Sequence, residues 1–318
     1  MKRISVIGAN SFIGKHLLQA LSNEDVQVKA LGRKYSPHNE AMAVAGKVEF
    51  FQGDLLEPES LHTFIVPDDV VVNLVYLSQA TREENLVAIK NLADACVAKK
   101  AKRLIHISTA VVSGATPETE IHEDSPCVPV SEYQINKYAI EQLLLSYQPQ
   151  FEVIILRPSA VFGPQGKNLL KLAHDLQHGS PIINYLKSCM MGCRTMNLVY
   201  VNNVVASILF LAAIADLENK HIFLISDHDH KNNYRDIEAY LLSRFYPQYY
   251  WLPVIELPRV FFRSLSVLLR KNQTNPKQIY LNRNLSALGF EKPITFQDGL
   301  NYFADWYLRD NKNEGFKC

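Results

Sequence analysis

The chain has 318 residues, of which 47% are hydrophobic and 20% charged, and its formal net charge is +1. This composition is that of an ordinary globular protein with one large or two modest cores. The near-neutral charge argues against a dedicated nucleic-acid-binding protein and against a polybasic membrane-surface protein.

The five cysteines are scattered and odd in number, which indicates free thiols in a reducing cytoplasm. Cys189 and Cys193 lack the spacing of a zinc site, so we expect no metal. The apolar run after residues 1–3 is soon interrupted by Gly8 and Asn10. It therefore indicates a strand followed by a loop, not a signal peptide.

A strand, a small-residue turn and a helix open the chain. The strand covers residues 4–7, the turn runs from Gly8 to Gly14, and helical periodicity follows in residues 15–21. Backbone amides and the helix dipole then point at one place, which suits a pyrophosphate. Ser11 stands where a third glycine is expected, and its hydroxyl could donate to a phosphate oxygen. The cofactor-binding residues predicted here are Gly8, Asn10, Ser11, Phe12, Ile13 and Gly14.

The end of the second strand indicates the type of dinucleotide. Residues 26–31 form this strand, and Gly32 follows where NAD-binding folds place an acidic residue for the ribose hydroxyls. Arg33 comes next and can grip a 2′-phosphate with its planar guanidinium. We therefore favour NADP(H), with NAD possible. Alternatively, Arg33 and Lys34 are solvated loop charges.

Strands and helices continue to alternate along the chain. Strands are expected at residues 48–52, 70–75 and 103–107, with a helix over 83–99. This alternation predicts an α/β fold with a doubly wound parallel sheet, whose ligands lie at the carboxyl ends of the strands. Asp54 and Leu55 follow the strand at 48–52, where a carboxylate can meet the adenine amino group.

A further helix is expected to begin near Ser131 or Glu132. It places Tyr133 and Lys137 one turn apart on the same face. A close ammonium stabilises a phenolate and so lowers the pKa of a tyrosine toward neutrality, which suits acid-base chemistry. Taken alone, the pair also fits a solvated helix face.

Five motifs together resemble the extended short-chain dehydrogenases/reductases, and most of all their nucleotide-sugar epimerase and dehydratase branch. They come in the order and at about the spacings of that family. Later segments at 197–204 and 288–300 resemble it too, so that the likeness covers nearly the whole chain. The five motifs are residues 8–14, 53–54, 108–114, 133–137 and 157–164.

The resemblance implies roles for three residues. Tyr133 would be the general acid/base, Lys137 would lower its pKa and hold the nicotinamide ribose, and Thr109 would bond the reacting oxygen. It also implies a Rossmann domain over 1–165 and a smaller α/β substrate-binding domain over 166–318, with 197–226 returning to the first sheet. The departures from the family pattern are Ser11, Ser113, where Tyr is frequent, and Asn203, where Asp is common.

The segments after residue 165 give weaker indications. Asn168 and Arg194 are candidates for binding a diphosphate or a sugar hydroxyl, or else are solvated loop residues. Residues 228–230, His-Asp-His, look like a metal cluster but lie in a polar turn, so we interpret them as solvated. Residues 204–213 are too short to span a bilayer and indicate a buried helix.

Two segments near the C-terminus remain. Residues 259–271 form either a substrate-domain helix packed inward or an amphipathic face that meets a membrane surface. Residues 311–318 resemble a frayed tail.

We therefore expect a cytoplasmic oxidoreductase that uses NADP(H), or NAD, on a nucleotide-activated (NDP) sugar. The favoured reaction is reduction of a keto sugar. The alternatives are an epimerase with tightly bound NAD, acting on an NDP sugar or a polyprenyl-diphosphate-linked sugar, and a non-catalytic NADP-sensing protein. A dehydratase is disfavoured because the residues after Thr109 are apolar, not acidic. The resemblance also implies a homodimer that pairs helices 83–99 and 132–147.

Overall fold

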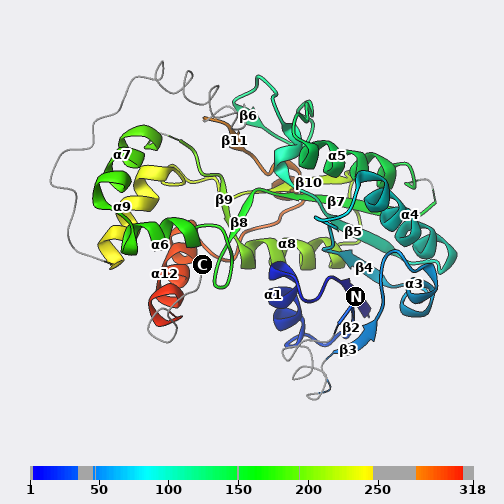
Figure 1. The fold of residues 1–318 in the computed structure, drawn as a ribbon. Coiled ribbons are helices and arrows are strands. Elements are labelled where there is room, and N and C mark those ends of the chain that lie inside the picture. Colours follow the sequence, from blue (N-terminus) through cyan, green and yellow to red (C-terminus); the bar gives the residue numbers. More distant parts are fainter. Residues whose placement is uncertain are drawn as a thin grey trace.

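A seven-stranded parallel sheet forms the centre of the fold (Figure 1). The structure, a computed structural model, describes residues 3–34, 46, 48–148, 150–192, 194–245 and 277–310. The predictions for residues 259–271 and 311–318 lie outside this part of the chain. In sheet order the strands are β10 (Ile222–Ile225), β7 (Glu152–Pro158), β5 (Arg103–Ile107), β4 (Val70–Asn73), β1 (Arg3–Ile7), β2 (Gln27–Gly32) and β3 (Glu49–Gln52).

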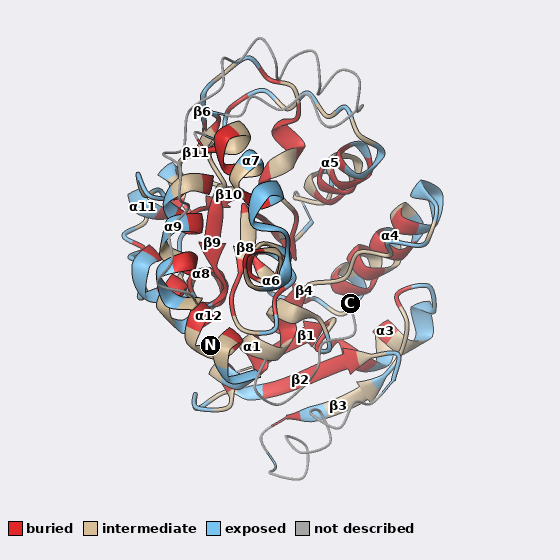
Figure 2. Ribbon diagram, turned by 60° about the vertical axis from the view of Figure 1, so that its left-hand side comes forward, coloured by how far each residue is buried: buried red, intermediate tan, exposed pale blue. Residues whose placement is uncertain are grey.

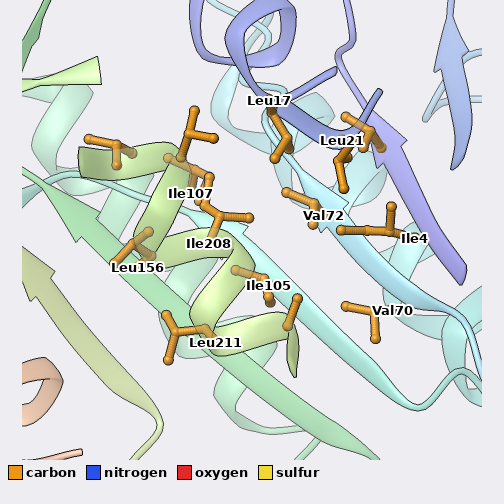
Figure 3. Close-up of a cluster of buried hydrophobic side chains, with 14 of the residues drawn as sticks. Ile4, Leu17, Leu21, Val70, Val72, Ile105, Ile107, Leu156, Ile208 and Leu211 are labelled. Atoms are coloured by element: carbon orange, nitrogen blue, oxygen red, sulfur yellow. The ribbon is translucent and has the colours of Figure 1, made fainter. Parts of the chain in front are cut away.

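Helices cover both faces of this sheet, which confirms the doubly wound fold. On one face, α1 and α8 share a core with alternate strand residues such as Val70 and Val72 (Figure 3). On the other, α3, α4 and α5 pack on the intervening residues such as Val71. The bounds of these helices are α1 (Phe12–Leu21), α3 (Pro58–Phe64), α4 (Arg82–Ala98), α5 (Glu132–Leu145) and α8 (Val201–Ala213).

The strand order reverses between β1 and β4, because the chain builds outward from β1 first toward β3 and then toward β10. Loops that leave β1 and β4 at this point diverge to opposite faces, and open α/β sheets bind ligands there. Figure 2 shows β1 and β2 largely buried, so the sheet gives the loops at its carboxyl edge a rigid base.

The remaining helices gather at one side of the sheet (Figure 1). Four of them share a second core, with residues such as Leu176, Leu241 and Phe303. Their bounds are α6 (Leu170–His178), α7 (Pro181–Met191), α9 (Tyr234–Phe245) and α12 (Phe296–Asp310); α11 (Arg283–Ala287) lies beside β10. Outside the large sheet, the described residues form two small parallel pairs, β8 (Ala160–Phe162) with β9 (Leu198–Tyr200) and β6 (Glu120–Ile121) with β11 (Ile279–Tyr280), and a 3-10 helix, η1 (Ala110–Ser113).

The expected elements occur with small shifts that have local causes. The first helix begins at Phe12, because the side chain of Ser11 accepts a hydrogen bond from the Gly14 amide and caps it. The fourth strand ends at Asn73, whose side chain accepts from the amide of Val75 and turns the chain. In the described part of the chain, none of the helices combines the length and apolarity needed to cross a membrane.

Candidate active site

The loop after β1 and the start of α1 form a cradle that only glycine permits. Gly8 has a φ of +89°, and a Cβ added to Gly14 would lie 2.4 Å from the Gly8 carbonyl oxygen. The loop therefore packs directly on α1, whose first backbone amides have no partner within the helix. These amides and the positive end of the helix suit a pyrophosphate, so the residues present fit a dinucleotide.

The other predicted residues of this loop have distinct places. Asn10 donates from its side chain to the Lys34 carbonyl oxygen (3.0 Å) and so ties the loop to the end of β2. The ring of Phe12 lies against Gly166: a Cβ added to Gly166 would be 2.7 Å from Cζ of Phe12. Ile13 is partly buried and packs on the core between α1 and the sheet. The phosphate loop thus contacts both the end of β2 and the loop after β8.

Two cations stand exposed at the end of β2. Arg33 and Lys34 follow Gly32, and both side chains are exposed. In the next loop, the carboxylate of Asp54 accepts from the Leu56 amide (3.0 Å), and Leu55 is buried in the core. The side chain of Leu55 therefore supports the loop, and its assignment to the cofactor stays a prediction.

The structure brings Thr109, Tyr133 and Lys137 together. Thr109 follows β5, and its hydroxyl lies close enough to the phenol of Tyr133, the second residue of α5, to lower the pKa of that phenol. Lys137, one turn along α5, is 4% exposed and donates from Nζ to the Ile107 carbonyl oxygen (3.0 Å). Two hydroxyls and a buried ammonium therefore meet at the carboxyl end of β5.

The local electrostatics keep the phenol protonated. Partial burial and the nearby phenol of Tyr76 raise the pKa of Tyr133, and the nearby hydroxyl of Thr109 only partly offsets them. Burial lowers the pKa of Lys137 to about 8, against the opposite influence of Glu141. The sequence led us to expect a lowered tyrosine pKa. The structure differs because burial and the phenol of Tyr76 outweigh the groups that lower this pKa, while the Lys137 ammonium donates to a backbone carbonyl.

The sequence profile of the NAD dependent epimerase/dehydratase family matches residues 4–226. The chain belongs to this family. This membership confirms the family expected from the sequence and, with it, an NAD-dependent enzyme of the extended short-chain dehydrogenase/reductase type. The match includes the phosphate cradle and all three residues of the Thr109–Tyr133–Lys137 site.

Individual relatives of the epimerase/dehydratase family are distant. The human dTDP-D-glucose 4,6-dehydratase is 26% identical over 232 residues, which are 65% of this chain and 65% of the dehydratase. The dTDP-4-dehydrorhamnose reductase of Mycolicibacterium smegmatis is 28% identical over 58% of this chain and 53% of the reductase. The chain therefore spans less than two thirds of the length of either relative.

A solved structure shows the shared fold over nearly the whole chain. The dTDP-glucose 4,6-dehydratase of Bacillus anthracis, in complex with NAD, superposes with a TM-score of 0.74 at 18% identity and covers 98% of both chains.

Two parts of this site were not predicted from the sequence. Tyr76, three residues after β4, lies with its ring 5.3 Å from that of Tyr133, and the Lys137 ammonium lies 5.1 Å from its centroid. Glu141 forms a buried ion pair with Arg157 and accepts a hydrogen bond from Ser108. The available signals were an aromatic residue at the carboxyl end of a central strand and a carboxylate four residues after Lys137.

The two predicted substrate residues have other surroundings than the Thr109–Tyr133–Lys137 site. Asn168 is exposed and donates from its side chain to the Val161 carbonyl oxygen (2.7 Å), whereas Arg194 is exposed after α7. In the part of the chain that the structure describes, neither of them forms a hydrogen bond with Thr109 or Tyr133. Their assignment to a substrate stays a prediction.

The departures from the family pattern have local explanations. The hydroxyl of Tyr280, from β11, lies 3.4 Å from that of Ser113, so the small serine side chain leaves room for a phenol from another strand. The side-chain amide of Asn203 donates to both Asp227 and the Ile294 carbonyl oxygen, which an aspartate could not do. At residues 228–230, His230 lies with Nδ1 3.4 Å from a carboxylate oxygen of its neighbour Asp229, and the described residues contain no group of three or more potential metal ligands.

Proposed function

We propose that this chain is an NAD(P)(H)-dependent oxidoreductase of a nucleotide-activated sugar and that it reduces a keto sugar to an alcohol. The observation that carries the proposal is the meeting of the Thr109 and Tyr133 hydroxyls at the carboxyl end of β5 with the buried ammonium of Lys137, which donates to the Ile107 carbonyl oxygen. A carbonyl oxygen placed between two hydroxyls is polarised and receives a proton from one of them. The same arrangement on a solvated helix face would not have buried its lysine.

When bound, the nicotinamide supplies hydride to the carbonyl carbon. Thr109 holds the carbonyl oxygen, and the phenol of Tyr133 gives its proton to that oxygen as negative charge develops there. The raised pKa of Tyr133 favours the protonated phenol that this step needs. The ammonium of Lys137 stabilises the resulting phenolate until solvent restores the proton. Carbon gains hydride, oxygen gains a proton, and the product is an alcohol.

The cofactor in this proposal is NADPH. The cradle from Gly8 to Gly14 would hold the pyrophosphate, Lys137 the nicotinamide ribose, and Asp54 the adenine amino group. Arg33 would bind the 2′-phosphate, because it is exposed at the end of β2 where no carboxylate follows the strand. A cofactor that exchanges after each turnover suits net reduction.

An epimerase with tightly bound NAD is the second candidate. The family name and the NAD in the related dehydratase structure favour it. The same three residues would then first remove a proton from a sugar hydroxyl and later return it, and the sugar could carry a nucleotide or a polyprenyl diphosphate. A dehydratase is disfavoured because Ala110 and Val112, which follow Thr109, are buried and apolar.

Mixing the purified protein with NADPH and a panel of NDP-keto sugars separates these functions. Steady loss of reduced-cofactor absorbance, abolished in Y133F, supports the reductase. Isomerised sugar without net oxidation of NADPH supports the epimerase instead. Binding of NADPH without any turnover shows the third alternative, a non-catalytic sensor.

We also propose that two copies of the chain pair through α4 and α5. A groove of about 600 Å³ runs between these helices and is lined by residues of both, among them Leu86, Tyr138 and Leu143. Apolar side chains at its border are exposed, with Val87 50% and Ile135 37% accessible. A second copy of the same two helices would cover these side chains.

Light scattering after size-exclusion chromatography tests the dimer. The wild type is expected at twice the chain mass, and V87D is expected as a monomer because a charge would be buried at the interface. I182D, on the exposed side of α7, is the matched control and stays dimeric. A monomeric wild type, or a V87D protein that stays dimeric, would overturn the proposal.

A further inference from the structure

One aromatic ring touches both members of the acid-base pair. Tyr76 lies in the loop after β4, at the point of the sheet where the strand order reverses. Its ring meets that of Tyr133 edge to face, at 5.3 Å and an interplanar angle of 86°. The Lys137 ammonium lies over the same ring at 5.1 Å from the centroid. Edge-to-face contacts and cations over a ring face are both favourable at these distances.

The buried ammonium needs such a partner. Lys137 is 4% exposed, and burial of an uncompensated ammonium strongly disfavours its charged form. Nζ has one hydrogen bond to a neutral group, the Ile107 carbonyl oxygen. The negative face of the Tyr76 ring supplies a second, electrostatic contact at the place where this charge is desolvated.

The other ionisable groups near Lys137 do not replace its contact with the Tyr76 ring. Glu141, on α5, attracts the ammonium, but its carboxylate is already paired with Arg157 of β7. His106, in β5, is fully buried, and burial together with Lys137 lowers its pKa, so it is neutral. Tyr133, also on α5, is a protonated phenol at neutral pH.

We propose that Tyr76 is a positioning residue whose ring face keeps Lys137 in its ammonium form and whose edge-to-face contact fixes the phenol of Tyr133. The ring acts through Lys137 and Tyr133 and takes no part in proton transfer. The consequence for turnover rests on the proposed reductase function, whereas the effect on the charge of Lys137 does not.

Lysine labelled with ¹³C at Cε allows the charge of Lys137 to be followed by NMR during a pH titration. The signal absent from K137M belongs to Lys137. Y76L keeps apolar bulk but removes the ring face, and we expect it to lower the titration midpoint of Lys137 by about one pH unit. Y76F keeps the face and titrates with the wild type. Y147L, which removes a tyrosine at the far end of α5, is the matched control and also leaves the midpoint unchanged.

A Y76L midpoint equal to or above that of the wild type overturns the proposal, because the ring then acts only by filling space. Equal shifts in Y76F and Y76L overturn it too, since they assign the effect to the hydroxyl. Y76M serves the same purpose if Y76L does not fold. With a keto-sugar substrate, Y76L is further expected to lose activity at a lower alkaline pH than Y76F. If Y76L lowers the titration midpoint of Lys137 but the wild type turns over no keto sugar, this inference stands and the reductase function is rejected.

Discussion

Glu141 and Arg157 form a buried ion pair between α5 and β7. The carboxylate of Glu141 is fully buried and accepts from Nη2 of Arg157 at 2.6 Å and from Nε at 3.0 and 3.2 Å. Burial and the carboxylate act in opposite directions on the guanidinium, and the net result is a raised pKa of Arg157. The pair joins α5 to β7 one helical turn from Lys137, so it fixes the depth at which α5 sits on the sheet.

Removal of one partner of this pair is expected to be strongly destabilising. E141Q leaves the guanidinium of Arg157 buried without its counter-charge, and we expect the free energy of unfolding to fall by about 3–5 kcal/mol. The double variant E141L/R157M removes both charges, so it should lose less stability than E141Q. Urea unfolding of the three proteins measures the difference. A double variant that is no more stable than E141Q contradicts this account.

The buried ammonium of Lys137 predicts a pH-dependent stability. Its pKa is about 8 in the folded chain, compared with about 10.4 for an unperturbed lysine. Between these values the unfolded chain binds the extra proton, so stability rises with pH through this window. Below pH 8 both states are protonated, and the full penalty of about 3 kcal/mol is present.

K137M should therefore be more stable than the wild type at pH 7, and its advantage should shrink as the pH is raised from 8 to about 10. Urea unfolding at a series of pH values provides the measurement. K102M replaces an exposed lysine and serves as the control for the loss of one positive charge. A difference between K137M and the wild type that stays constant over this range would show that the ammonium is not penalised by burial.

The sequence predicted those parts of the site that depend on neighbouring residues or on the ends of strands. Gly8 and Gly14 frame a turn between a strand and a helix, and Tyr133 and Lys137 are separated by one helical turn. Thr109 follows a strand whose carboxyl end faces the ligand edge of a parallel sheet. Local periodicity and the geometry of parallel strands are sufficient for these placements.

Other contacts depend on which segments meet after folding, and sequence patterns do not encode them. Tyr76 reaches Tyr133 because β4 lies beside β5, under α5. Ser113 and Tyr280, 167 residues apart, meet only because β6 pairs with β11. The lowered pKa expected for Tyr133 could not be tested from spacing alone. It depends on how deeply the phenol is buried and on which groups meet it after folding: burial and Tyr76 raise its pKa, and the Lys137 ammonium donates to the Ile107 carbonyl oxygen.

Arg33 offers a test of cofactor choice that does not require a substrate. R33A should weaken NADPH binding about 10- to 100-fold, the range expected for losing a charged hydrogen bond to the 2′-phosphate, and leave NADH binding unchanged. Titration calorimetry with NADPH and with NADH gives the ratio of the two affinities in R33A and in the wild type. K102A removes an exposed cation at the amino end of β5, on the opposite edge of the sheet, and should alter neither affinity. Equal losses for NADPH and NADH would place Arg33 away from the 2′-phosphate.

The N-terminal cap of α5 should matter for both stability and catalysis. Ser131 accepts from the Gln134 amide at 3.3 Å, and the Gln134 side chain accepts from the Ser131 amide at 3.0 Å. S131A should lower the free energy of unfolding by about 1 kcal/mol. Because Tyr133 is the second residue of the helix, fraying of this first turn should also lower kcat.

Thr81 caps α4 with the same arrangement, in which Thr81 and Glu84 satisfy each other's amides. T81A should therefore lose about the same stability as S131A while kcat stays near that of the wild type. Urea unfolding and turnover of a keto sugar, measured on both variants, compare a cap beside the site with a cap remote from it. If T81A lowers kcat as much as S131A does, the effect is one of general stability, and the first turn of α5 has no special part in placing Tyr133.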